Sequence, residues 1–103
     1  MINDLGRNSY DIAANVLAVE RAKSRMLSDM ARVFEIMAGE NADGLIEDSL
    51  ADLILNAYLL SAKMGIDFAV LDNIAVNKLK LLIINDETGI FPYAELKNRL
   101  SIR

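Results

Sequence analysis

Three aspartates, Asp29, Asp48 and Asp52, are the side chains whose type and spacing could hold a divalent cation. Asp48 and Asp52 are four residues apart, so they share one face of a helix. Asp52 lies inside the apolar segment 50–64, where burying an uncompensated carboxylate would be costly. A bound metal, a hydrogen bond or an ion pair would remove that cost. Because carboxylate oxygens are the preferred ligands of Mg²⁺, the pattern indicates a metal or nucleotide contact at Asp52, with a structural ion pair as the alternative.

The residues that are missing narrow the chemistry further. The chain contains no cysteine and no histidine. Thiol nucleophiles, thiolate zinc sites, serine–histidine triads and histidine general bases are therefore excluded. Glycine-rich phosphate-binding motifs are also absent. Any metal would have to be bound through oxygen, as magnesium, manganese and calcium are.

Composition describes a small acidic chain with a large apolar fraction. It has 103 residues, of which 53% are hydrophobic, and a net charge of −4. This length predicts one domain over residues 1–103, and so much apolar side chain predicts a homodimer or homotetramer. The acidic balance argues against a nucleic-acid partner, because the basic footprint for a phosphate backbone is missing.

Neither a signal peptide nor a membrane span is indicated. The first residues lack a basic segment followed by an apolar one. Asp52, Asn56 and Lys63 interrupt the most apolar run before it reaches the roughly 18 residues that a span requires. We therefore expect a soluble, cytoplasmic protein with no membrane partner.

The aspartates must be positioned by helices, because the chain has one proline and few glycines. Residues 1–8 are expected to form a loose arm. Candidate caps are Ser9, Asp43 and Asp67 at helix starts, with Gly39 and Gly65 after helix ends. Four helices are expected, over residues 10–38, 45–64, 68–84 and 92–100. The predicted core stripe of the first helix is Ile12, Val16, Val19, Met26, Met30, Val33 and Met37.

The first two helices should pack as an antiparallel hairpin, because a short turn joins them. Partner positions across this hairpin should have numbers that sum to roughly 81 to 84. That register predicts Asp29 and Asp52 as neighbours, with a cation or proton between them to relieve their repulsion. A salt bridge from Arg32 to Asp52 is the competing explanation.

Simpler structural roles are open for the other charged candidates. Glu47 and Asp48 could be first-turn acids that the helix dipole stabilises. Glu35 has the position of a solvated surface acid. Lys78 could contact a phosphate or could belong to a solvated helix face.

The segment IEDSLADLILNAYLLSAKMGID, residues 46–67, resembles the second-motif region of MazG-like nucleoside triphosphate pyrophosphohydrolases. The resemblance extends over roughly residues 20–82. Residues 27–35 stand where the family has its first acidic motif, and residues 77–79 look like its basic end segment. The matching positions are Glu47, Asp48, Leu50, Ala51, Asp52, Gly65, Ile66 and Asp67.

This resemblance implies an all-α bundle that forms dimers or tetramers and cleaves a nucleoside triphosphate to the monophosphate and pyrophosphate with a metal. It also implies Mg²⁺ (or Mn²⁺) held by Asp29, Asp48 and Asp52, with Asp48 and Asp52 catalytic. Lys78 and Arg32 would bind substrate. The alternative is a non-catalytic nucleotide-binding or helical assembly protein on the same scaffold.

The chain departs from the family's two acidic pairs, E-x-x-E and E-x-x-D. Arg32 replaces the second acid of the first pair, which reads Asp-Met-Ala-Arg. Ser49 replaces the first acid of the second pair, which reads Ser-Leu-Ala-Asp. Two carboxylates beside an arginine neutralise less cationic charge than four, so the departure bears on catalysis more than on fold.

Overall fold

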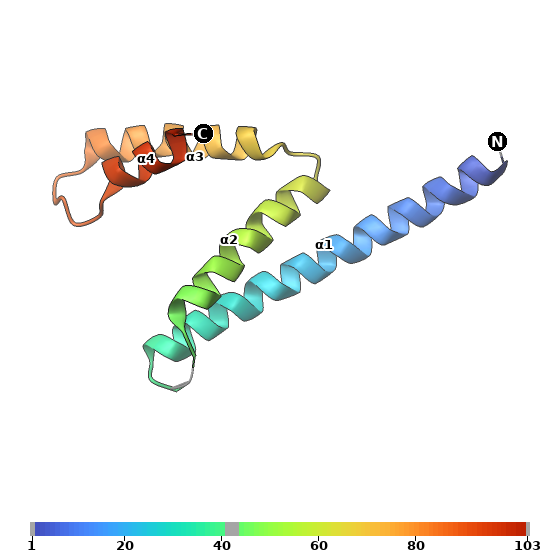
Figure 1. Cartoon of the computed structure of the whole chain (residues 1–103), viewed down its shortest axis with the longest axis horizontal. Coiled ribbons are helices and arrows are strands. Elements are labelled where there is room, and N and C mark those ends of the chain that lie inside the picture. The colour runs from blue at the N-terminus through green and yellow to red at the C-terminus, as the bar shows by residue number, and fades with distance from the viewer. Residues whose placement is uncertain (1, 41–43, 103) are drawn as a thin grey trace. The chain divides into compact units, whose positions relative to one another are not determined.

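A computed structural model describes the backbone of residues 2–40 and 44–102, and the side chains of residues 11–40 and 44–102. Every regular element in these residues is a helix, as predicted (Figure 1). The helices are α1 (Ile2–Met37), α2 (Ile46–Lys63), α3 (Phe68–Asn85) and α4 (Tyr93–Ser101). The chain divides into two compact units, residues 1–65 with α1 and α2 and residues 66–103 with α3 and α4.

In the first unit α1 and α2 pack against each other as the expected antiparallel hairpin (Figure 1). The positions of reduced exposure along α1 alternate at spacings of three and four, which is the pattern of a coiled-coil seam. We call the following residues the seam: Val19, Ala22, Met26, Asp29, Val33 and Ile36 of α1, and Ile46, Ser49, Leu53, Asn56 and Leu60 of α2.

Two side-chain contacts show which residues of α1 and α2 face each other in this hairpin. The Asn56 amide bonds to Asp29, and the two numbers sum to 85. Lys63 Nζ donates to Asn15 Oδ1 over 3.4 Å at the open end, and those numbers sum to 78. The observed contacts therefore bracket the predicted range of 81 to 84.

The composition of the seam differs from the predicted stripe of α1. Only Val19, Met26 and Val33 of that stripe have reduced exposure. Ile12, Val16, Met30 and Met37 are exposed, and Ala22 and Asp29 occupy seam positions instead. Small residues permit close approach of two helices, so the larger side chains on the neighbouring face are left outside.

The ends of the helices agree with the sequence except at the beginning of α1. Helix α1 starts at Ile2, so residues 2–8 are helical and the predicted loose arm is wrong for them. Gly39 and Gly65 both have φ of +78°, the left-handed conformation expected of glycines that follow helices. The proposed cap Asp43 lies outside the described residues.

In the second unit α3 packs on α4. Leu71, Ala75 and Leu79 of α3 have reduced exposure. Leu82 and Leu96, in contrast, are exposed by 44% and 48%. Helix α4 starts at Tyr93 with Pro92 as its N-cap residue.

The 85–89 turn between α3 and α4 is organised by Asp86. Its Oδ1 accepts hydrogen bonds from Gly89 N at 3.0 Å, Thr88 N at 3.1 Å and Thr88 Oγ1 at 3.2 Å. The bond from the Gly89 amide contributes most to a lowered pKa of the Asp86 carboxyl. The turn chemistry is therefore local and does not depend on the hairpin of the first unit.

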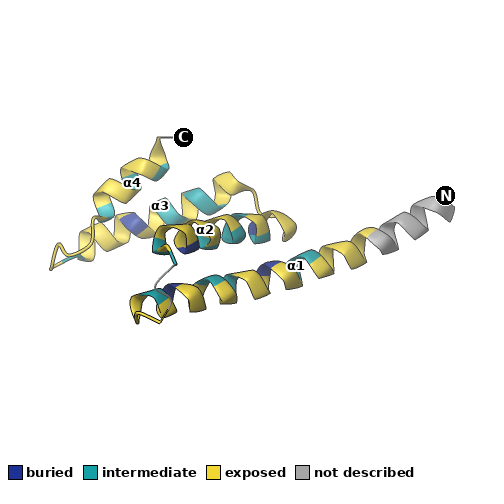
Figure 2. Ribbon diagram, turned by 60° about the horizontal axis from the view of Figure 1, so that its bottom comes forward, coloured by how far each residue is buried: buried dark blue, intermediate teal, exposed yellow. Residues whose placement is uncertain are grey.

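Exposed positions predominate along all four helices (Figure 2). Among the described residues the buried hydrophobic side chains are only Ala22, Val33 and Leu79. None of the helices in those residues combines the length and hydropathy needed to cross a bilayer.

Candidate functional site on the α1–α2 hairpin

The seam divides the remaining surface of the hairpin into two sides. In an antiparallel pair, residues that directly precede seam positions flank one edge of the contact, and residues that follow them flank the other. We call the first the charged side and the second the apolar side. The charged side carries Ala18, Arg21, Arg25, Ser28, Arg32 and Glu35 of α1, with Leu45, Asp48, Asp52, Leu55, Leu59 and Ala62 of α2. The apolar side carries Leu27, Met30, Phe34, Met37, Leu50, Ile54, Ala57 and Ser61, with the charged residues Glu20, Lys23 and Glu47 toward its ends.

Asp29 is the only acidic residue at a seam position, and its partner is an amide. Asn56 Nδ2 donates to Asp29 Oδ2 over 2.8 Å in a part-buried setting. Asn56 lies one helical turn beyond Asp52. The partner of Asp29 is therefore the Asn56 amide, and not the Asp52 carboxylate that the predicted register placed opposite it. The hydrogen bond supplies a donor to the charged carboxylate that burial would otherwise penalise.

Asp48 and Asp52 are both exposed on the charged side. Asp48 lies in the first turn of α2 together with Glu47, which is where the helix dipole favours acids. Asp52 is not buried, so it does not carry the desolvation cost that its apolar surroundings in the sequence suggest. Among the side chains that the structure describes, no group of three or more acids is close enough together to form a metal site.

Arg32 lies on the same side of the hairpin and is exposed. Within the described residues it makes no ion pair to Asp52, and the salt bridge that α1 makes there joins Lys23 to Glu20 at 3.0 Å. The competing explanation of Asp52 as half of a salt bridge to Arg32 is therefore wrong for this conformation.

Ser49, which stands at the first acidic position of the second motif, is 1% exposed. It is the most buried side chain among the described residues and lies in the seam against α1. A glutamate there would place its carboxylate inside the helix contact. The serine is thus part of the packing of the hairpin.

Lys78 belongs to the second unit, on α3, where it is exposed. Its contact with a phosphate stays a prediction.

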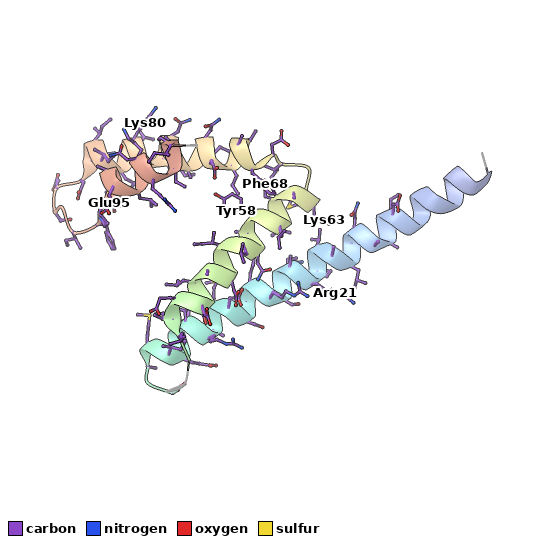
Figure 3. All side chains as sticks on the ribbon, in the orientation of Figure 1. Arg21, Tyr58, Lys63, Phe68, Lys80 and Glu95 are labelled. Carbon is purple, nitrogen blue, oxygen red and sulfur yellow. The ribbon has the colours of Figure 1, made fainter. Side chains whose placement is uncertain are left out.

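Three basic residues that sequence reasoning passed over converge on one groove of the hairpin. Arg21 and Arg25 of α1 and Lys63 of α2 line a cavity of about 310 Å³ on the charged side. Figure 3 shows Arg21 on α1 and Lys63 at the facing end of α2. The spacing of the arginines, four residues, was a detectable signal, but the approach of Lys63 depends on the hairpin register.

Comparison with known proteins gives one match. Residues 12–93 match the sequence model of the MazG-like family, a range that contains α2, α3 and most of α1. No curated protein and no solved structure matches the chain. The matched range covers most of the chain and includes both acidic motif regions, and the all-helical architecture agrees with it, so the chain belongs to the MazG-like family.

Proposed function

We propose that this protein binds a nucleoside triphosphate with Mg²⁺ or Mn²⁺ and cleaves it to the monophosphate and pyrophosphate. The family membership supports a nucleotide substrate, and its members generally depend on a metal. The observation that carries the proposal is the Asp29–Asn56 hydrogen bond. This bond holds the Asp29 carboxylate of α1 against α2, on which Asp48, Asp52 and Asn56 follow one another at intervals of four residues.

The oxygen donors present suit a metal that arrives with the substrate. Magnesium is commonly bound by one or two carboxylates together with substrate phosphates, rather than by a cage of protein ligands. Asp48 and Asp52, one turn apart and exposed, offer such a pair. Asp29 retains one carboxylate oxygen that Asn56 does not use. When bound, the metal would neutralise phosphate charge and activate water.

The chain's own residues would then orient the phosphates. Arg32 lies on the charged side with Asp52 and has a guanidinium without an ion pair in the described residues. A guanidinium forms paired hydrogen bonds with phosphate oxygens. Lys78 of α3 is the second proposed phosphate contact.

A non-catalytic nucleotide-binding protein on the same scaffold is the second candidate. One feature favours it, because the second motif has buried Ser49 in place of an acid. Binding without turnover would follow if the remaining acids hold the metal–nucleotide complex but do not activate water.

Pyrophosphate release from a panel of nucleoside triphosphates, with magnesium and then with manganese, tests the first candidate. Release from any member supports it. A thermal shift with nucleotide but no pyrophosphate from any member would replace it with the binding protein. No shift and no release would leave only a helical assembly role.

We also propose that the chain forms a homodimer or homotetramer through the apolar side of the hairpin. Leu27, Phe34 and Met37 are exposed by 69%, 61% and 70%, and Leu50 and Ile54 lie on the same side. Contiguous exposed apolar surface of this kind typically marks a protein interface. A second hairpin packed there would complete a four-helix bundle and leave the charged side open.

A further inference from the structure

The groove on the charged side has an unusual lining for an acidic protein. Its walls come from both helices of the first unit, and its volume is about 310 Å³. The lining residues are Ala18, Arg21, Ala22, Arg25, Asn56, Leu59, Ala62 and Lys63. Three of them are cationic and none is acidic, although the chain as a whole has a net charge of −4.

The cations of the groove are not neutralised by the side chains that the structure describes. Arg21 and Arg25 make no ion pair there, and Lys63 Nζ contacts a neutral amide oxygen, that of Asn15, at 3.4 Å. Arg21 and Arg25 are one helical turn apart, and like charges at that spacing repel each other. An anion between them would turn that repulsion into attraction.

Small side chains make room for such an anion. Three of the eight lining residues are alanines, Ala18, Ala22 and Ala62. The volume is at the lower end of the range of small-molecule sites, about 300 to 1,000 Å³. Arginine guanidinium groups present paired donors that match the oxygens of a phosphate.

We propose that this groove is a binding site for the phosphate chain of a di- or triphosphate ligand, with Arg21, Arg25 and Lys63 as its contacts. Three cations match the charge of a short phosphate chain, whereas a nucleic-acid backbone requires a longer basic surface. The choice of a nucleotide as the source of that chain rests on the proposed function. Inorganic pyrophosphate or tripolyphosphate carries the same chemistry.

The Asn56 side chain connects this groove to the seam. Asn56 lines the groove and also donates a hydrogen bond to Asp29. The groove therefore starts at Asn56, one helical turn after Asp52 on α2. Asp29 itself does not line the groove, so a phosphate chain there would not need a metal to shield it from that carboxylate. Binding to the basic groove should therefore be measurable with the metal removed.

The test measures binding of tripolyphosphate and of ATP by the full chain in EDTA at low ionic strength, by calorimetry. We expect the double variant Arg21→Gln/Arg25→Gln to lose at least tenfold in affinity for both ligands. The control Lys23→Gln/Arg99→Gln removes the same charge from exposed positions outside the groove and should change affinity less than twofold. Equal losses in the two double variants, or no binding of either ligand by the unchanged chain, would overturn the proposal.

A second variant tests the groove without changing charge. Ala62 is an exposed lining residue, so Ala62→Phe should fill the cavity and weaken binding while helical circular dichroism is retained. Unchanged affinity in Ala62→Phe would contradict a site in this cavity. Equal affinity for tripolyphosphate and ATP would show that the phosphate chain alone is recognised, and tighter ATP binding would show a nucleoside contribution at the same groove.

Anion binding by the groove and the proposed pyrophosphohydrolase activity can be refuted independently of each other. Asp52→Ala should leave metal-free anion binding unchanged, because Asp52 does not line the groove. Unchanged anion binding in the arginine variant, with pyrophosphate release by the unchanged chain intact, would refute the groove only. Intact anion binding without pyrophosphate release in any condition would refute the hydrolase only.

Discussion

Asn56 Nδ2 donates a 2.8 Å hydrogen bond to Asp29 Oδ2 across the α1–α2 seam. This pair forms a polar layer in an otherwise largely apolar contact between two helices. A polar residue at a seam position commonly specifies the register of a helix pair, because any shift leaves it without its partner. The pair therefore connects the packing of the hairpin to the position of a candidate site residue.

Removing the amide should destabilise the hairpin. In Asn56→Ala the part-buried Asp29 carboxylate loses its donor, which typically costs about 1–3 kcal/mol. Urea unfolding followed by circular dichroism measures the change in free energy of unfolding. Asn73→Ala, at an exposed position of α3, is the matched control and should have little effect. Equal stability of the two variants would show that the hydrogen bond does not hold the register.

Asp52 should be required for turnover if the protein is a pyrophosphohydrolase. Asp52→Ala removes one of two exposed carboxylates on α2 and should lower pyrophosphate release by about 10²-fold or more, the scale of losing a key electrostatic contact. Glu35→Ala removes an exposed acid of α1 and should leave the rate unchanged. A rate in Asp52→Ala close to that of the control would remove Asp52 from the site.

Arg32→Glu should raise affinity for Mn²⁺, because it restores an acid of the first family motif at an exposed position. Manganese binding can be followed by electron paramagnetic resonance. Arg99→Glu makes the same charge change on α4 and should not raise the affinity. If Arg32→Glu binds no more manganese than Arg99→Glu, the account of a degenerate metal site fails.

Ser49 is the other position at which the chain lacks an acid of the family motifs, and restoring an acid there should destabilise the hairpin. Ser49 is 1% exposed, so Ser49→Glu would force a carboxylate into the seam and should cost several kcal/mol of stability. Thermal unfolding of Ser49→Glu and Arg32→Glu, measured side by side, checks this contrast. Similar midpoints for the two variants would contradict the buried position of Ser49.

The hydrogen bonds to Asp86 predict that the stability of the 85–89 turn depends on pH. Hydrogen bonds from Gly89 and Thr88 lower the pKa of Asp86 below its value in an unfolded chain. The turn therefore gains stability above the unfolded pKa, and loses it as the pH falls through the lowered pKa. A carboxyl titration by NMR should give Asp86 a pKa below that of an aspartate in an unfolded chain, and Thr88→Ala should raise it. A pKa of Asp86 that does not respond to this change would contradict the role of the threonine.

The apolar side should control assembly. Phe34→Glu and Leu27→Glu place charges in the middle of that side and should shift the chain toward monomer in light scattering coupled to size exclusion. Ser28→Glu introduces the same charge on the charged side and should leave the mass unchanged. An oligomer that persists in both apolar-side variants would place the interface elsewhere.

Sequence alone determined the helical class, the approximate extents of α2, α3 and α4, the antiparallel hairpin and the family. These rest on local signals, namely apolar periodicity, Gly39 and Gly65 after helices, and the Asp-bearing segment 46–67. Such signals depend on residues that are close together in the sequence, so they can be recognised before the tertiary contacts between helices are known. The start of α1 was missed because residues 2–8 carry little periodicity.

The tertiary structure alone decided which of two neighbouring faces of α1 enters the seam. Both faces are apolar enough to qualify, and periodicity does not distinguish large exposed side chains from small buried ones such as Ala22 and Ser49. That choice set the register, and the register gave Asp29 the amide of Asn56 as its partner. It also brought Lys63 to Arg21 and Arg25, because a groove between two helices exists only once their contact is fixed.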